Sequence, residues 1–129
     1  MQNEEAKRSD FDVEISTFRR LEPRLYRALC KKIESGTGPF GNSVFVVWFV
    51  ITSKRCRRRE VKGYINKNSG LVREMIRALS GKEYSAKDRV NLLDLDLEDK
   101  ECVIDVEVRK GKNNAITGYS PISDFPDIE

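Results

Sequence analysis

The stretch VFVVWFVIT, residues 44–52, consists only of β-branched and aromatic residues, the types that β-strands favour. Alternate residues of a strand point to opposite faces, and here both rows are apolar. The stretch therefore predicts a central strand that is covered on both faces. Because a small barrel needs large side chains to fill it, we expect Phe45, Trp48 and Phe49 to pack in the core. The two rows are Phe45, Val47, Phe49 and Ile51 on one face, and Val44, Val46, Trp48 and Val50 on the other.

Four other segments have the composition and alternation of strands. They are LYRALCKKIE (25–34), EVKGYIN (60–66), CVIDVEV (102–108) and AITGYSPI (115–122). Between the first strand and the central one, residues 35–43 read SGTGPFGNS, and three Gly and one Pro there predict a long loop. Gly63 lies inside the strand 60–66, where a glycine suggests a bend or a bulge.

One helix is expected after the strand 60–66. Its apolar residues recur at helical spacing, Asn68 or Ser69 can cap its N-terminus, and Gly81 provides its C-terminal stop. The apolar positions are Leu71, Val72, Met75, Ile76 and Leu79. Residues 82–100 are polar with interspersed leucines, so we expect irregular structure that packs leucines beneath a sheet.

The predicted order is strand, strand, strand, helix, strand, strand. This order favours an all-β protein with one helix, a five-stranded OB-fold, which is a partly open Greek-key barrel. An SH3-like barrel or a β-sandwich does not place an amphipathic helix at this point. We divide the chain into an N-terminal tail or added edge strand (1–18), an OB-fold domain (19–122) and an acidic C-terminal tail (123–129). The first of these has Phe11, Val13 and Ile15 at alternate positions.

Length and charge narrow the class of protein. The chain has 129 residues, which suits one domain, and no apolar run that could span a membrane or serve as a signal peptide. Three Cys without CxxC spacing, and no His, predict a cytoplasmic protein without disulfides or zinc. Residues 19–67 hold 13 Lys and Arg against three Asp and Glu. This asymmetry favours a polyanionic partner, although Lys and Arg also serve simply to solvate the outer faces of strands.

Several blocks of the sequence resemble small phage and prophage proteins of replication and recombination modules, many of which have no assigned function. The blocks are PRLYRALCKKIESG, FVVWFVIT, REVKGYIN, LVREMIRALSGKEY, DKECVIDVEV and NNAITGYSPI, which together span roughly residues 23–122. Those proteins are similar to OB-fold proteins that bind single-stranded DNA, and the resemblance implies a role in coating or handling single strands. The basic connection SKRCRRR (53–59) departs from the shorter, Gly-containing turn expected there, so the role of this loop is not implied by the resemblance.

Binding of single strands requires cations for the phosphates and aromatic rings on which bases stack. The candidate cations follow the central strand, lie in the strand 60–66, or lie in the last hairpin. The stacking candidates are Phe40, in the first hairpin loop, and Tyr64, which shares a polar face with Lys62. Trp48 or Phe49 of the central strand is a further stacking candidate, although core packing is favoured for both. The cations are Lys54, Arg55, Arg57, Arg58, Arg59, Lys62, Arg109, Lys110 and Lys112.

The C-terminal residues SDFPDIE combine acids with apolar residues. They resemble the acidic, aromatic tail tips with which bacterial single-strand binding proteins recruit replication or recombination proteins. The candidate partner-binding residues are Asp124, Phe125, Asp127 and Ile128. An ordinary chain end has the same composition.

We expect a protein that binds single-stranded DNA largely without sequence preference and that is not an enzyme, because no His is available as a general base. We expect no cofactor and no metal: GTGPFG (36–41) matches a dinucleotide-binding spacing but precedes a strand rather than a helix. The alternatives are a non-catalytic adaptor that docks on a replication or recombination complex, and an RNA-binding OB module. A monomer and a homo-oligomer are equally compatible with the sequence.

Overall fold

The computed structural model describes residues 21–85, 87–108 and 114–128, so the expectations for residues 1–18 and for Arg109, Lys110 and Lys112 lie outside the described residues. The described chain forms the predicted series of five strands with one α-helix after the third. The elements are β1 (Arg24–Thr37), β2 (Ser43–Ile51), β3 (Glu60–Asn66), α2 (Gly70–Ser80), β4 (Glu101–Val108) and β5 (Asn114–Ser120), with 3-10 turns η1 (Leu92–Leu95) and η2 (Ile122–Asp124). None of the described helices has the length and apolar character needed to cross a bilayer.

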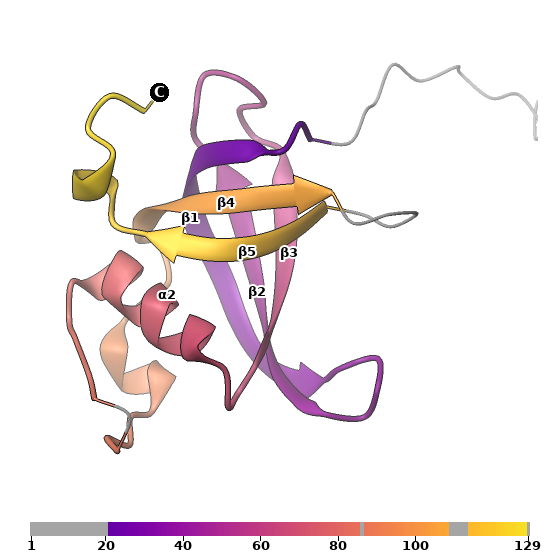
Figure 1. The fold of residues 1–129 in the computed structure, drawn as a ribbon, viewed down its shortest axis with the longest axis vertical. Coiled ribbons are helices and arrows are strands. Elements are labelled where there is room, and N and C mark those ends of the chain that lie inside the picture. The colour runs from indigo at the N-terminus through magenta and orange to yellow at the C-terminus, as the bar shows by residue number, and fades with distance from the viewer. Residues whose placement is uncertain (1–20, 86, 109–113, 129) are drawn as a thin grey trace, which may run out of the picture.

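The five strands form one antiparallel sheet in the order β3-β2-β1-β4-β5. β1 pairs with β4 through Arg24–Leu29 and with β2 through Ala28–Thr37, and its register shifts between Cys30 and Lys32. A bulge of this kind bends a strand and increases its twist. The sheet therefore curves over itself, and β4 and β5 cross in front of β2 and β3 (Figure 1).

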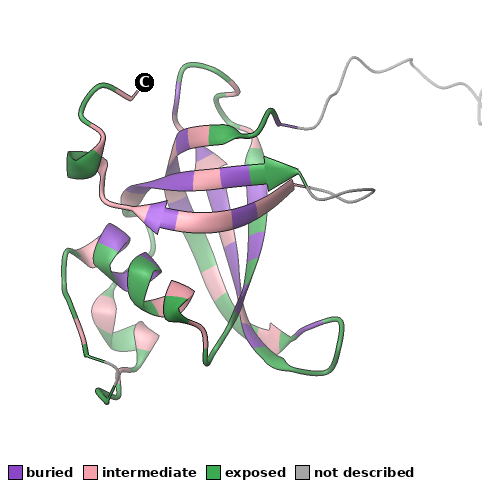
Figure 2. Ribbon diagram, in the orientation of Figure 1, coloured by how far each residue is buried: buried purple, intermediate pink, exposed green. Residues whose placement is uncertain are grey.

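The core lies between these two layers and is closed at one end by α2. Phe49 and Tyr119 contact each other across it with ring centroids 5.7 Å apart. Buried and exposed residues alternate along β3 without interruption, as Figure 2 shows. The largest fully buried side chains include Tyr26, Phe49, Ile51, Ile65, Met75 and Ile104.

Both predicted ends of the helix are confirmed. The Ser69 hydroxyl accepts a hydrogen bond from the Leu71 amide at 3.1 Å, and Gly81 takes the left-handed conformation that ends the helix, with φ 74°. The buried face of α2 consists of Met75, Ile76, Ala78 and Leu79.

Three local expectations are wrong. β1 continues through Ser35–Thr37, so the loop before β2 is shorter than predicted, because residues of low strand propensity still pair when β2 lies alongside. Gly63 makes no bulge: β2 and β3 pair without a register shift. Trp48 lies outside the core, on the face of β2 opposite Phe49. The leucine expectation is met only in part, because Leu97 is buried whereas Leu93 is 88% exposed.

Gly63 allows the edges of β3 and β5 to come close together. A Cβ atom at Gly63 would lie 3.0 Å from the Tyr119 hydroxyl oxygen and 3.1 Å from Ile116 Cδ1. The Tyr119 hydroxyl is buried and has no hydrogen-bond partner among the described residues. The absence of a side chain at residue 63 is therefore a packing requirement.

We predict that Gly63→Ala lowers the free energy of unfolding by about 1–3 kcal/mol, the usual range for overpacking a core. Tyr119→Phe removes an unpaired buried hydroxyl, so alone it should leave stability unchanged or slightly higher, and it should recover part of the loss in the double variant. Urea unfolding measures all three variants. Gly70→Ala is the matched control, because a Cβ there meets nothing within 4 Å; equal effects at residues 63 and 70 would contradict the packing argument.

The buried thiols predict a loss of stability in alkali. Burial raises the pKa of Cys30 to about 12 from its ordinary 9.0, and burial also raises the pKa of Cys102 and of Tyr119. Above about pH 9 the unfolded chain gives up thiol protons that the folded chain keeps, so the free energy of unfolding should fall by up to about 1.4 kcal/mol per pH unit for each such thiol. Urea titrations under reducing conditions, from neutral pH upward, measure this slope.

Cys30→Ala should reduce that slope by about one proton whatever its effect on absolute stability. Cys56→Ala is the control, because Cys56 lies in the β2–β3 connection and is only half-buried. If the two variants keep the same slope as the unchanged protein, the buried thiol is not the source of the alkaline loss.

Candidate nucleic-acid interface

The outer face of β1, β2 and β3 gathers cationic and aromatic side chains from three strands. The register places Lys32 opposite Trp48, and Trp48 opposite Lys62. Tyr64 follows two residues later on the same face of β3 and is 52% exposed. We name Lys32, Trp48, Lys62 and Tyr64 the outer-face cluster.

The lysines of the outer-face cluster lie against its rings. The Lys62 ammonium is 5.1 Å from the Trp48 ring centroid and 5.4 Å from that of Tyr64, and the Lys32 ammonium is 5.3 Å from the Trp48 centroid. These distances lie within the range of cation–π attraction. The arrangement places aromatic rings, on which bases can stack, beside ammonium groups, which can pair with phosphates.

Carboxylates also lie on this face, so its charge is mixed. Glu34 forms an ion pair with Lys32, and the exposed Glu60 lies opposite Val50 at the end of β3. The excess of positive charge therefore comes from beyond the strands.

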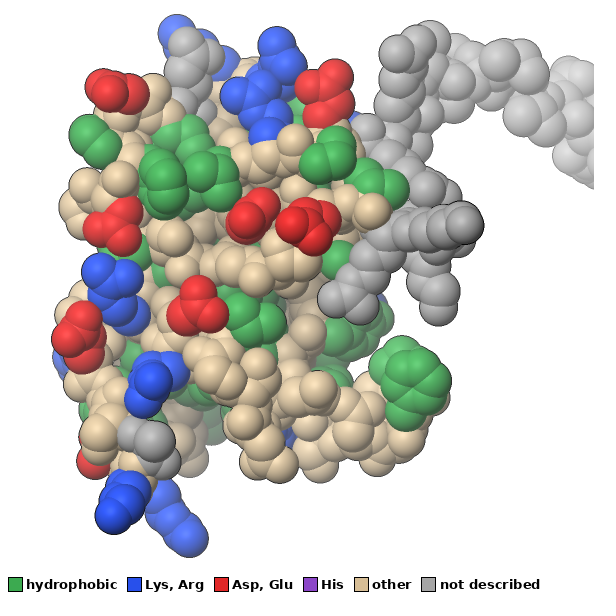
Figure 3. Space-filling model, viewed as in Figure 1, with side chains coloured by type: hydrophobic (Ala, Val, Ile, Leu, Met, Phe, Trp, Pro, Cys, Tyr) green, Lys and Arg blue, Asp and Glu red, His purple; other side chains and the backbone are tan. Residues whose placement is uncertain are grey.

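That excess lies in the β2–β3 connection, which carries Lys54, Arg55, Arg57, Arg58 and Arg59. Hydrogen bonds from the Arg58 amide to the Ile51 carbonyl and from the Ile51 amide to the Arg59 carbonyl, 2.9 and 2.8 Å long, close this loop. Lys54, Arg57 and Arg58 are exposed, whereas Arg59 is half-buried and Arg55 pairs with Glu22 at 3.1 Å. Figure 3 shows Lys and Arg side chains gathered at this end of the molecule.

Phe40 lies in the loop at the opposite end of β2. It is 94% exposed, so it does not fold back over the core. The loop is closed by hydrogen bonds between Gly38 and Asn42 and from the Gly41 amide to the Gly38 carbonyl. We name the β2–β3 connection (residues 52–59) the arginine loop. Phe40 and the arginine loop thus lie at the two ends of β2, with the outer-face cluster between them.

The C-terminal residues lie against the body of the molecule. Asp124 pairs with Arg77 of α2 at 3.6 Å, and the Ile128 amide donates to the Phe125 carbonyl at 3.1 Å. Phe125 and Ile128 are half-buried and line a shallow groove with Arg24. Their use in binding a partner stays a prediction.

Lys62 and Tyr64 are thus brought together as predicted, on the polar side of β3. Sequence reasoning missed Lys32, and it favoured the core for Trp48 although Trp48 was also a stacking candidate. The signal for Trp48 was ambiguous, because both rows of β2 are apolar and only the pairing with Lys62 shows which row faces outward. Lys32 follows a bulge that no feature of the sequence announces, and the bulge changes which residues of β1 share a face.

A comparison with protein-family models and with curated proteins finds no match to this chain.

The outward position of Trp48 predicts its response to ionic quenchers. Trp48 is the only tryptophan, so it is the source of the fluorescence. Because Lys32 and Lys62 flank the ring, iodide should quench it more strongly than caesium does, and Lys32→Gln/Lys62→Gln should reduce that difference. A core tryptophan would resist both ions equally. Arg73→Gln, on the exposed side of α2, is the control for general charge.

Proposed function

We propose that the chain is an OB-fold protein that binds single-stranded DNA across the outer face of β1–β3, largely without sequence preference and without catalysis. The observation that carries the proposal is the outer-face cluster, in which Trp48 lies between two lysines and beside Tyr64. In OB-folds the face of the second and third strands and the adjoining hairpin loops form the nucleic-acid site. The outer-face cluster occupies the corresponding strands here.

The strand arrangement supports the OB assignment. β1 pairs with both β2 and β4, α2 lies between β3 and β4 in the chain, and the two edges of the sheet are β3 and β5. Those edges approach each other at Gly63 and Tyr119, where a Cβ would be only 3.0 Å from the hydroxyl oxygen. A sheet whose edge strands meet through side chains is a partly open barrel of the kind the OB-fold describes.

In the proposed binding mode the aromatic rings bind the bases and the cations bind the phosphates. Trp48 is diagonal to Tyr64 across the β2–β3 pair, a separation of about 7–8 Å in antiparallel sheets, so neighbouring bases of one strand can reach both rings. Lys32 and Lys62 are placed beside the rings for phosphates, and the arginine loop extends the positive surface beyond them. Phe40 offers a further ring at the other end of β2.

The cellular setting we propose, a replication or recombination module, follows from the sequence resemblance. An RNA-binding module would use the same rings and cations, and a competition between DNA and RNA oligonucleotides distinguishes the two. The adaptor alternative is favoured by a separate feature, a groove beside β1 that Ile33, Phe45 and Leu93 line.

The first test is binding of a fluorescent single-stranded oligonucleotide, measured across salt and sequence. Tyr64→Ala should lower affinity by roughly 5- to 150-fold, equivalent to about 1–3 kcal/mol for one stacked base, with a small loss of stability because Tyr64 is half exposed. With three to five phosphate contacts, affinity should fall roughly 20- to 130-fold between about 50 and 200 mM salt.

The arginine loop gives the second arm of the same experiment. Arg57→Ala/Arg58→Asn should weaken binding to all sequences alike and flatten the salt dependence, with asparagine chosen because Arg58 has a φ of 71°. Arg73→Gln/Lys87→Gln removes the same charge from α2 and the segment after it and is the matched control. No binding at micromolar protein, or a flat salt response, would overturn the proposal; equal losses from both double variants would remove the loop from the site.

A further inference from the structure

β1 leaves one edge open beyond its bulge. The ladder to β4 ends at Leu29, and the last contacts on that side are backbone hydrogen bonds of Cys30 with Lys100 and Asp99, 2.8 and 2.7 Å long. From Lys32 onward β1 pairs with β2 alone among the described residues. The Ile33 amide points out of the open edge, where it donates to the Glu98 carboxylate at 3.2 Å. Strand alternation then turns the main-chain groups of Ser35 and Thr37 to the same edge.

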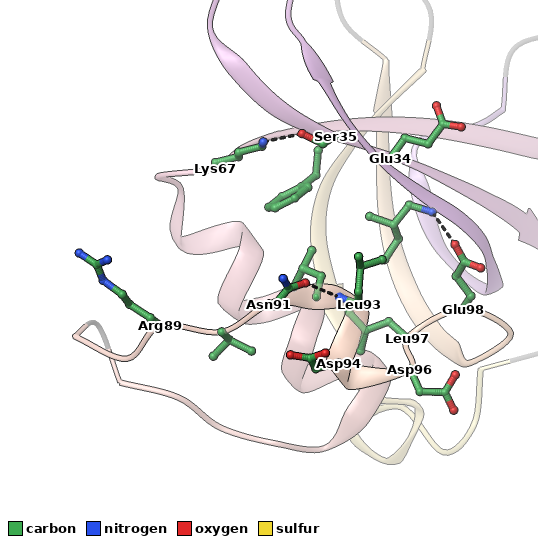
Figure 4. Close-up of a pocket in the computed structure, with 14 residues that line it drawn as sticks. Glu34, Ser35, Lys67, Arg89, Asn91, Leu93, Asp94, Asp96, Leu97 and Glu98 are labelled. Carbon is green, nitrogen blue, oxygen red and sulfur yellow. Dashed lines mark hydrogen bonds between the residues drawn. The ribbon is translucent and has the colours of Figure 1, made fainter.

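A groove of about 900 Å³ lies beside this edge. Its floor is apolar and comes from β1, β2 and the segment before β4, and its rim carries the 88% exposed Leu93. Figure 4 shows Lys67 reaching across one end to Ser35, while Asp94 and Asp96 lie on the opposite wall. The apolar lining residues are Ile33, Phe45, Val90, Leu92, Leu93 and Leu97.

The rim of the groove is predominantly acidic. Glu34, Asp94, Asp96 and Glu98 line it, against the two cations Lys67 and Arg89. Glu34 is paired with Lys32, and Lys67 is held by Ser35 and the Phe45 ring. Asp94 and Asp96 form no ion pair with any described residue, and no three acidic or thiol groups in the described chain converge as a metal site does. Two exposed carboxylates are therefore available to an incoming cation.

We propose that this groove binds an extended, basic segment of a partner protein, which adds as a strand to the open edge of β1. In this mode main-chain hydrogen bonds supply affinity, and side chains at alternate positions supply specificity. Apolar side chains of the partner fill the groove over Ile33 and Phe45, and its Lys or Arg side chains reach Asp94 and Asp96. The inference does not depend on nucleic-acid binding, because none of the residues that line the groove belongs to the outer-face cluster. The two surfaces touch only where Glu34 pairs with Lys32.

Charge favours a basic segment of a partner over the two ends of this chain as the occupant of the groove. Residues 1–18 alternate apolar residues as an added strand would, but they hold five acids against two bases. The C-terminal residues are acidic too, and they lie against α2 and the start of β1. An acidic strand would meet Asp94 and Asp96 with like charge. A basic partner segment gains attraction at the same positions.

The test uses an acetylated, amidated heptapeptide of alternating lysine and valine, added to the full-length protein without nucleic acid. A shift of register by one residue exchanges the two rows, so this probe can present either row to the groove. We expect the amide resonances of Ile33–Thr37 and of residues 92–97 to shift. The acidic twin, with glutamate in place of lysine, should not bind, and N-methylation of every valine and lysine amide should abolish binding by removing all main-chain donors.

The variant that tests the wall is Asp94→Asn/Asp96→Asn, in which asparagine tolerates the φ of 52° at residue 96. It should weaken peptide binding about two- to thirtyfold, the effect of losing two exposed ion pairs. Glu74→Gln/Glu107→Gln makes the same charge change at exposed residues outside the groove and should have no effect. Equal binding of the acidic twin or of the N-methylated probe would overturn the proposal. So would shifts confined to Glu60–Tyr64, or dimers in sedimentation that occupy the edge with a second copy.

Discussion

The architecture depends on β1 belonging to both layers of the sheet. Its first half is hydrogen-bonded to β4 and its second half to β2, and the change occurs at the register shift between Cys30 and Lys32. Because the strand bends there, β4 and β5 can cross over β2 and β3 and enclose the core between them. The same bend has two other consequences: it turns Lys32 onto the outer face, and it carries Ile33–Thr37 away from β4 so that their edge is open.

The two apolar rows of β2 serve different purposes. Val47, Phe49 and Ile51 fill the core, whereas Val44 and Val46 lie on the outer face and are nevertheless buried. Glycines pass close to them: a Cβ at Gly38 would lie 3.1 Å from Val44, and one at Gly36 would lie 3.4 Å from Val46. The end of the first hairpin thus passes close to the outer row where that row is aliphatic. Trp48, farther along the row, is flanked instead by lysine side chains.

The order of elements could be predicted because it depends on local signals. Ser69 and Gly81 mark the helix ends, and the alternation of residues 60–66 correctly places Tyr64 outside. The pairing of strands could not be predicted. Lys32 lies opposite Trp48 because of the register between β1 and β2, and the sequence predicts a longer loop between these two strands than the structure has. Gly63 shows the same limit: a glycine in a strand signals either a bulge or a close approach, and only the position of Tyr119 decides between them.

The composition of the outer face bears on sequence preference. Reading a base requires donors and acceptors fixed in place, as a paired amide or a forked guanidinium provides. On this face the polar amide is Asn66, and its side chain is already hydrogen-bonded to Asn42. The outer-face cluster offers π-faces and ammonium groups, with which any base and any phosphate can interact. A nucleic-acid strand bound here would therefore be held through interactions that all bases and phosphates share. Discrimination between base sequences would have to come from a second ligand on another surface.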